Sequence, residues 1–166
     1  MQYLAMNNSE EPVHLIQRLQ LQPHPEGGWF REVFRSKVRV EADAGVRSGL
    51  TTIYYLLERN QLSRWHVVKS AEVWHFYAGA PLELLTYDPA SRGYTRTVLS
   101  SLGEGYQPLG IVEAGIWQAA RSTGSHSLIG CSVGPGFEFA DFQFVTALPD
   151  YQRHFTGELS AHRDLL

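Results

Sequence analysis

The segment SRWHVVKSAEVWHFYAG, residues 63–79, predicts two short β-strands joined by a turn at Lys69-Ser70. Successive side chains of a strand point to opposite faces, so His66 and Val68 share one face of the first strand. In the second strand, Glu72, Trp74 and Phe76 share one face for the same reason. If both faces point inward, His66 and Glu72 meet across a hairpin. The segment therefore predicts a protein interior that contains an imidazole and a carboxylate.

The sequence on both sides of this segment has the same β character. Short runs rich in β-branched and aromatic residues are separated by turns rich in glycine, serine and proline. The expected strands are Trp29–Arg35, Leu50–Leu57, Trp65–Val68, Glu72–Tyr77, Leu82–Tyr87, Thr95–Leu99, Gly110–Val112, Trp117–Ala120, Leu128–Val133 and Phe137–Val145. Many short strands without alternating helices indicate a sandwich or barrel rather than a parallel α/β sheet. We therefore expect an all-β fold.

Helical signals are concentrated before the first strand. We expect one short helix at about residues 10–20, with Ser9 as the capping residue. The next segment, residues 22–28, contains two prolines and two glycines and is expected to form a shaped turn without a regular element. The polar tail from about Leu148 onward is expected to be a surface appendage or a frayed end. These signals place the barrel core at about residues 22–147.

The composition is that of one folded domain. The chain has 166 residues, of which 43% are hydrophobic and 19% charged, enough for one sizeable core but too few for two ordinary domains. The formal net charge is -3 and there is no run of lysine or arginine, so the electrostatic signature of nucleic-acid or anionic-membrane binding is missing. We expect a single domain over residues 1–166 with no nucleic-acid or membrane partner.

The use of cysteine bears on the cellular compartment. Cys131 is the only cysteine, which excludes an intramolecular disulfide and a thiolate metal cluster within one chain. The apolar run around it, residues 128–133, predicts a buried and unreactive thiol. No stretch approaches the length that spans a bilayer, and the N-terminal residues lack the basic and apolar parts of a signal peptide. We therefore expect cytoplasmic localisation.

Two spaced motifs resemble those of the cupin superfamily. The first cupin motif contains His, His, Glu and Gly, and the second contains Pro-x-Gly followed by His. The corresponding residues of this chain are His66, Val68, Glu72 and Gly79, then Glu113-Ala114-Gly115 followed by Gln118. The strand, glycine-containing turn and strand of residues 110–120 predict that Gln118 faces inward.

Five longer segments are similar to one cupin subgroup, the Cupin_5 or DUF985 proteins, in the order of that subgroup. They are PHPEGGWFRE (23–32), WH (65–66), EVWHFY (72–77), WQA (117–119) and PGFEFADF (135–142). The resemblance covers about residues 15–144, and the chain is identified as a member. Membership implies a double-stranded β-helix, or jelly-roll, barrel, and the short N-terminal helix expected from the residues precedes it. The subgroup also resembles, more distantly, the metal-independent sugar-nucleotide epimerases.

The departures from the general cupin pattern concern the metal site. The usual cupin site offers three imidazoles and one carboxylate, whereas this chain has valine at position 68 and glutamine at position 118. His66, Glu72 and a neutral amide remain, and the loss of two imidazoles weakens the binding of a divalent ion. We expect no cofactor and no tightly held transition metal. A divalent ion held by these three residues is the alternative.

His66 and Glu72 are the candidate catalytic residues and also the first candidates for ligand binding. An imidazole titrates near neutrality, and a neighbouring carboxylate can orient and charge it. The alternative is a structural histidine that is hydrogen-bonded inside the barrel. Gln118 is expected on the same wall of the pocket.

The other candidates for ligand contacts are aromatic or basic. The aromatic candidates are Trp65, Trp74 and Trp117, with Phe137, Phe139 and Phe142 as further faces for stacking. Arg31 and Arg35 are expected to share a strand face, and paired guanidinium groups suit phosphate. His24, between two prolines, is a candidate for the rim of the pocket. The alternatives are ordinary core aromatics, a solvated face for the arginines, and a histidine that satisfies loop carbonyls.

These residues leave three functions open, and the sequence does not decide whether the protein is an enzyme. The first is binding of a nucleotide-like or sugar-nucleotide-like small molecule in the barrel. The second is a metal-independent epimerase or isomerase, with His66 as the base and Tyr54, Tyr55 and Tyr77 as candidate acids. The third is metal-dependent chemistry. We also expect a homodimer, because cupins commonly pair through their sheets.

Overall fold

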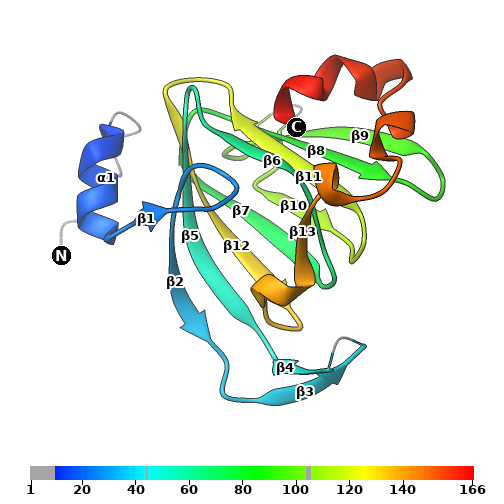
Figure 1. Ribbon diagram of the computed structural model, residues 1–166. Helices are drawn as coiled ribbons and strands as arrows, with labels where there is room; N and C mark the ends of the chain where they lie inside the picture. The colour runs from blue at the N-terminus through cyan, green and yellow to red at the C-terminus, as the bar shows by residue number, and fades with distance from the viewer. Residues whose placement is uncertain (1–9, 44, 104–105) are drawn as a thin grey trace.

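The computed structural model describes residues 10–43, 45–103 and 106–166, which form two antiparallel sheets packed face to face (Figure 1). The six-stranded sheet contains, in spatial order, β1 (Gln22–Pro23), β2 (Trp29–Arg35), β5 (Thr51–Glu58), β12 (His126–Gly134), β7 (Ala71–Gly79) and β10 (Leu109–Val112). The five-stranded sheet contains β13 (Phe142–Phe144), β6 (Leu62–Val68), β11 (Trp117–Ser122), β8 (Leu82–Asp88) and β9 (Gly93–Leu99). The expected all-β cupin barrel is confirmed.

Nine of the ten expected strands are confirmed, with differences of a few residues at their ends. The tenth, expected over residues 137–145, is a strand only at β13, because Phe139–Asp141 form the 3₁₀ turn η1. Sequence analysis missed β3 (Arg39–Ala42) and β4 (Gly45–Ser48), which form a separate hairpin that projects at the bottom of Figure 1. Their alternation of polar and small residues carries little hydrophobic signal.

The expected N-terminal helix is α1 (Pro12–Leu19). Glu11 occupies the N-cap position without a side-chain hydrogen bond, and Ser9 lies outside the described residues. The helix buries Leu15 against Leu56 and Leu128, so it packs on the outer face of the six-stranded sheet. None of the helices in the described ranges is both long and apolar enough to cross a membrane.

The prediction that residues 63–79 form a β-hairpin around Lys69-Ser70 is wrong. β6 pairs with β11 and β13, whereas β7 pairs with β10 and β12, so the turn passes from one sheet to the other. The turn between β10 and β11 also changes sheet. His66 and Glu72 therefore reach the interior from facing sheets rather than from neighbouring strands. The inward alternation of both residues is as predicted.

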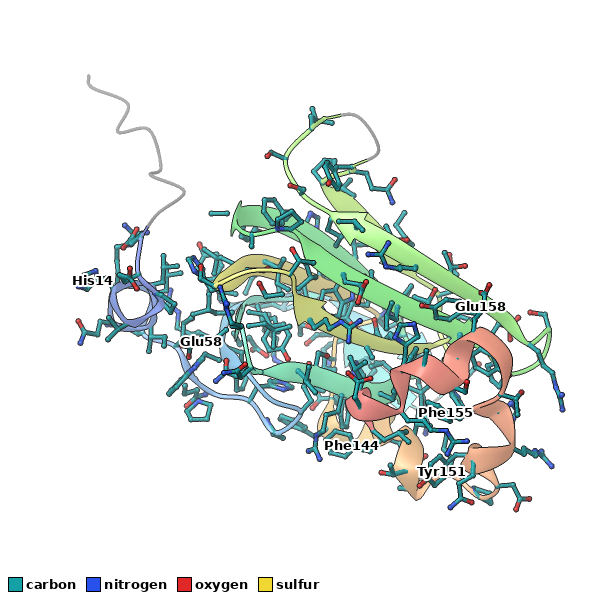
Figure 2. The ribbon with its side chains drawn as sticks, turned by 90° about the horizontal axis from the view of Figure 1, so that it is seen from above. His14, Glu58, Phe144, Tyr151, Phe155 and Glu158 are labelled. Atoms are coloured by element: carbon teal, nitrogen blue, oxygen red, sulfur yellow. The ribbon has the colours of Figure 1, made fainter. Side chains whose placement is uncertain are left out.

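The C-terminal tail is not the expected surface appendage. Its three 3₁₀ helices, η2 (Val145–Ala147), η3 (Tyr151–His154) and η4 (Gly157–Leu165), cover the outer face of the five-stranded sheet. Phe155, Leu159 and Leu165 are buried there against Trp65 and Trp117. Figure 2 shows this segment, with Tyr151 and Phe155 labelled, lying beside the sheet. The polar composition of the tail concealed a few well-spaced apolar residues that dock on a hydrophobic face.

Candidate functional site

A cavity of about 80 Å³ lies between the two sheets. Most of its wall is apolar, and its lining comes from β2, β5, β6, β7 and β12 together with the loops at residues 24–26 and 137–142. The lining residues are His24, Glu26, Phe30, Glu32, Arg35, Thr51, Ile53, His66, Val68, Glu72, Cys131, Val133, Phe137, Phe139 and Phe142. Seven ligand candidates were predicted besides His66, Glu72 and the phenylalanines. Of these, His24 and Arg35 line the cavity, whereas Gln118, Arg31, Trp65, Trp74 and Trp117 do not.

The loop before β2 carries His24 and Glu26 into the cavity. Gln22–Pro23 pair with β2, so the expectation that residues 22–28 lack any regular element is wrong. Gly27 has a φ of 115°, and a Cβ atom there would overlap the carbonyl oxygen of Leu62. Only glycine permits both this conformation and this close approach. The Tyr55 hydroxyl donates a 2.7 Å hydrogen bond to the Gly27 carbonyl and fixes the loop against β5.

His66 lies on β6 with its side chain almost fully buried. Its Nδ1 is 2.7 Å from the Arg64 carbonyl oxygen and 3.1 Å from Oε2 of Glu26. Because both neighbours accept hydrogen bonds, we assign the ring proton to Nδ1, which leaves the lone pair on Nε2. The ring stacks on Phe142 at a centroid distance of 5.0 Å. Burial lowers the pKa of His66, with Glu72 opposing that effect, so the neutral ring is favoured.

Glu72 is buried on the facing strand β7. Nε2 of Gln118 donates a 2.6 Å hydrogen bond to its Oε2, and Nε1 of Trp74 donates a 2.9 Å hydrogen bond to Oε1 of Gln118. Burial raises the pKa of Glu72, and the charge of His66 acts against that shift. Gln118 is therefore an internal partner of the carboxylate, and it does not line the cavity. Trp74 also lies behind the cavity wall, in the main core.

Glu26 is the functional candidate that sequence analysis missed. Its side chain is buried, with Oε2 close to His66 and Oε1 3.7 Å from Nδ1 of His24. Burial raises the pKa of Glu26 above its ordinary value. The backbone N–H of Glu26 donates to Nδ1 of His24, so we assign the proton of neutral His24 to Nε2. The sequence did contain a signal for Glu26, because it lies between two prolines and two glycines. A loop made rigid in this way can hold a charged side chain in a buried position.

The two candidate arginines do not share a face. A β-bulge in β2 between Glu32 and Phe34 shifts the alternation, so Arg35 faces the cavity and Arg31 does not. Arg31 instead donates to Gln20 and lies over the ring of Tyr54. Arg35 is bound by carboxylates on both sides, with Nη2 2.8 Å from Glu32 Oε2 and Nη1 2.9 Å from Glu138 Oε1.

The three tryptophan candidates do not line the cavity. Trp65 and Trp117 lie on the outer face of the five-stranded sheet, and Nε1 of Trp65 donates to the carbonyl of His162 in the tail. This placement follows from alternation, since each is the sequence neighbour of an inward polar residue. The aromatic walls of the cavity are phenylalanines. They are Phe30, Phe137, Phe139 and Phe142.

The residues that replace the usual cupin metal ligands do not fit that site. Position 68 is valine, and both ends of the Gln118 amide are engaged by Glu72 and Trp74. Within the part of the chain that the structure describes, no three His, Cys, Asp or Glu side chains are grouped as a metal site. The Cys131 thiol lines the cavity, and burial raises its pKa well above the ordinary range. The expected lack of a cofactor stays a prediction.

Comparisons with known proteins agree with this architecture. A hypothetical protein from Leishmania major is 33% identical, with a TM-score of 0.75, and the match covers 81% of this chain and 86% of that one. Protein SO0799 from Shewanella oneidensis is 28% identical, with a TM-score of 0.81, and the match covers 94% of this chain and 97% of that one. The oxalate decarboxylase of Lactobacillus farciminis is similar in fold alone, with 18% identity and a TM-score of 0.57 over 88% of this chain and 41% of that one.

The chain also matches the model of a protein family. No curated protein matches the chain. The model of the Cupin superfamily (DUF985) matches residues 13–145, which is most of the chain and includes both walls of the cavity. The protein therefore belongs to the Cupin_5 (DUF985) family of the cupin superfamily.

Proposed function

We propose that the protein binds a small molecule in the barrel cavity, with His66, Glu72 and Glu26 as its polar contacts. The observation that carries the proposal is the placement of these buried ionisable groups in one largely apolar cavity. Burying such groups is costly, and a bound ligand that hydrogen-bonds to them offsets that cost. Among the described residues, the His66 ring makes hydrogen bonds only through Nδ1, so Nε2 is left for a ligand.

The size of the cavity limits the part of a ligand that can be enclosed. One water molecule needs about 10–15 Å³ by the measure that gives about 80 Å³ here. The cavity therefore has room for roughly five to eight water-sized groups. A nucleotide-like or sugar-nucleotide-like ligand, as the sequence favours, would insert one end and leave the rest outside. Its phosphate would also have to displace a carboxylate from Arg35.

Native mass spectrometry of freshly purified protein tests the proposal, with AMP and UDP-glucose as added nucleotide probes. We expect a co-purified or added small molecule on the wild type and at least about a tenfold loss of affinity in His66→Ala. His75→Ala is the matched control, because His75 lies on β7 with the alternation opposite to that of Glu72. Unchanged ligand affinity in His66→Ala, together with a large drop in melting temperature, would assign a purely structural role to His66.

A second candidate function is acid–base catalysis on a small carbonyl compound. It is favoured by the contact of His66 Nδ1 with Glu26, which orients the ring and leaves Nε2 as a base. Nε2 would remove a proton from the carbon next to the carbonyl, and Glu72 in its protonated form, which burial favours, would give its proton to the carbonyl oxygen. The reverse steps return the proton to carbon. Tyr54, Tyr55 and Tyr77 do not line the cavity, so none of them is placed as the acid.

Proton exchange in D₂O separates binding from this catalysis. If the second function holds, small ketones and aldehydes exchange their α-protons for deuterium faster with the wild type than with His66→Ala, as read by NMR. Binding without enzyme-dependent exchange would leave the first function alone. Metal-dependent chemistry is not favoured, because Val68 has no donor atom and the Gln118 amide is engaged by Glu72 and Trp74.

The expected homodimer and the cytoplasmic location also remain proposals. The edge strand β10 exposes Leu109 and Ile111, and the neighbouring β7 exposes Tyr77. An edge strand with exposed apolar side chains favours association with a second sheet. Sedimentation equilibrium at micromolar concentration is the test of the dimer, and a monomer at all concentrations would reject it.

A further inference from the structure

The side chains that line the cavity carry more negative than positive charge. Three glutamates, Glu26, Glu32 and Glu72, face the single arginine Arg35. Arg35 is already bound by Glu32 and by Glu138 at the mouth. In the described ranges, neither Glu26 nor Glu72 forms an ion pair with a lysine or arginine. The titratable groups beside them are the two histidines, the Tyr55 hydroxyl near Glu26 and the Cys131 thiol near Glu72. Burial lowers the pKa of each histidine ring.

Arg64 does not correct this imbalance inside the cavity. Its guanidinium acts on Glu26 from outside, where Nη2 donates to the Pro25 carbonyl and the group lies over the ring of Phe144. Glu72 faces His66 and, farther along, Glu26, which repels it. Two buried carboxylates therefore share one apolar space in which Arg35 is the permanent cation among the described lining residues, and Arg35 is already bound by Glu32 and Glu138.

The hydrogen-bonding groups in the cavity are mostly acceptors. The carboxylates of Glu26 and Glu72 accept hydrogen bonds, and so does Nε2 of His66, which has no partner in the described structure although its side chain is only 3% exposed. A primary ammonium group carries three N–H donors and no acceptor. The group that best satisfies these acceptors is thus a donor with positive charge.

The aromatic part of the cavity wall suits the apolar part of a molecule that carries an ammonium group. Phe142 stacks on the imidazole of His66, and Phe137 packs edge-on against Phe142. Phe30 lies against His24 at a centroid distance of 4.5 Å. Aromatic faces attract a desolvated cation and also pack against methylene groups. A phosphate or a carboxylate would instead meet two carboxylates of its own sign.

We propose that the cavity takes a compact organic cation, a primary ammonium on a short aliphatic chain, with the ammonium held by Glu72, Glu26 and His66. The proposal rests on the proposed binding function and names its ligand class. The cavity volume limits the enclosed part to roughly five to eight non-hydrogen atoms. n-Butylammonium meets this limit.

The test compares three molecules of nearly equal shape and different charge: n-butylammonium, n-butanol and n-butyrate. The methyl groups of Val68 and Val133 line the cavity and report binding by ¹³C NMR, whereas the exposed Val13 on α1 is the reference outside the cavity. We expect saturable shifts at Val68 and Val133 with n-butylammonium. Binding of n-butanol is expected to be at least about tenfold weaker, and n-butyrate is expected to give no shift.

Glu72→Gln tests the charge at constant shape, since a glutamine oxygen can still accept from Gln118. This substitution should weaken the affinity for n-butylammonium by about ten- to a hundredfold and leave the affinity for n-butanol unchanged. Glu158→Gln is the matched control, because it removes one negative charge from the exposed tail and should change neither affinity.

The outcomes separate the two proposals. Equal or tighter binding of n-butanol or n-butyrate would overturn the cation class while leaving small-molecule binding in the cavity intact. The same holds if Glu72→Gln and Glu158→Gln weaken n-butylammonium equally, because the effect would then come from net charge. If none of the three molecules shifts Val68 or Val133, both proposals fail.

Discussion

His66 shows how the two nitrogens of one ring acquire different roles. The Arg64 carbonyl and Glu26 both approach Nδ1, so the site fixes the tautomer before any ligand arrives. Alternation along β6 and β7 was enough to predict that His66 and Glu72 point inward. Alternation could not reveal Glu26, because its position depends on the close packing of Gly27 on Leu62.

Gln118 has a structural role at the same scale. Replacement of Gln118 by leucine leaves Glu72 and the Nε1 group of Trp74 without their hydrogen-bond partner in the core. Each unsatisfied buried group costs about 1–3 kcal/mol. We therefore expect Gln118→Leu to lower the free energy of unfolding by about 2–6 kcal/mol in urea denaturation.

The control for this prediction is Gln143→Leu, because Gln143 is exposed on β13. A change within about 0.5 kcal/mol is expected there. If Gln118→Leu were as mild as the control, the amide would be dispensable for the core, and its role as a ligand contact would return to consideration.

At the level of elements, the loop at residues 24–28 and the bulge in β2 decide which side chains reach the cavity. The bulge lies inside a run that reads as a regular strand, so the sequence predicted β2 with its observed bounds and still misplaced Arg31. The turn at Lys69-Ser70 was predicted, whereas its change of sheet was not. Pairing partners are long-range properties that the local pattern does not contain.

Alanine substitutions at two glycines test how tightly the loop at residues 24–28 is packed. Gly27→Ala combines a φ of 115° with an overlap between the new Cβ and the Leu62 carbonyl, whereas Gly115→Ala has a φ of 80° and open space around the Cβ. Gly115→Ala is expected to cost about 1–2 kcal/mol from conformation alone. Gly27→Ala should cost more than that and should weaken ligand binding, because the loop that carries His24 and Glu26 must move. Equal losses of stability in urea would contradict the tight packing of the loop.

The ion pair of Arg47 and Asp141 joins β4 to η1, next to the phenylalanines of the cavity. Nη2 of Arg47 is 2.9 Å from Oδ1 of Asp141, and hydrogen bonding to Arg47 lowers the pKa of that carboxyl while burial opposes the shift. A carboxyl whose pKa is lower in the folded state stabilises the fold above its unfolded pKa of about 4. That contribution is lost as the pH falls through the lower folded value.

Asp141→Asn should therefore lower the melting temperature at pH 7. The difference from the wild type should shrink steadily below about pH 4, as the wild-type carboxyl takes up its proton. Differential scanning calorimetry from pH 7 to pH 2.5 measures both effects. A difference that stays constant over that range would mean that the charge of Asp141 contributes nothing.

At the scale of the whole molecule, the described residues form two large hydrophobic layers and a smaller one under α1. The main core lies between the sheets, and a second layer lies between the five-stranded sheet and the C-terminal tail. The barrel could be predicted from the spacing of short strands and the family motifs. The second layer could not, because the tail has no strong periodicity and its anchors are separated by polar residues.

The tail's contribution to stability is the last prediction. Leu159 is 2% exposed and packs in the layer that contains Trp65 and Trp117, so Leu159→Ala should cost about 2–5 kcal/mol. Its neighbour Glu158 is exposed, and Glu158→Ala should change the free energy of unfolding by less than about 0.5 kcal/mol. Urea unfolding followed by tryptophan fluorescence measures both, because Nε1 of Trp65 donates to the His162 carbonyl of the tail. A frayed tail would make the two variants indistinguishable. A docked tail predicts that Leu159→Ala alone unfolds at lower urea concentration, while the cavity on the other side of the five-stranded sheet keeps its affinity for n-butylammonium in the folded fraction.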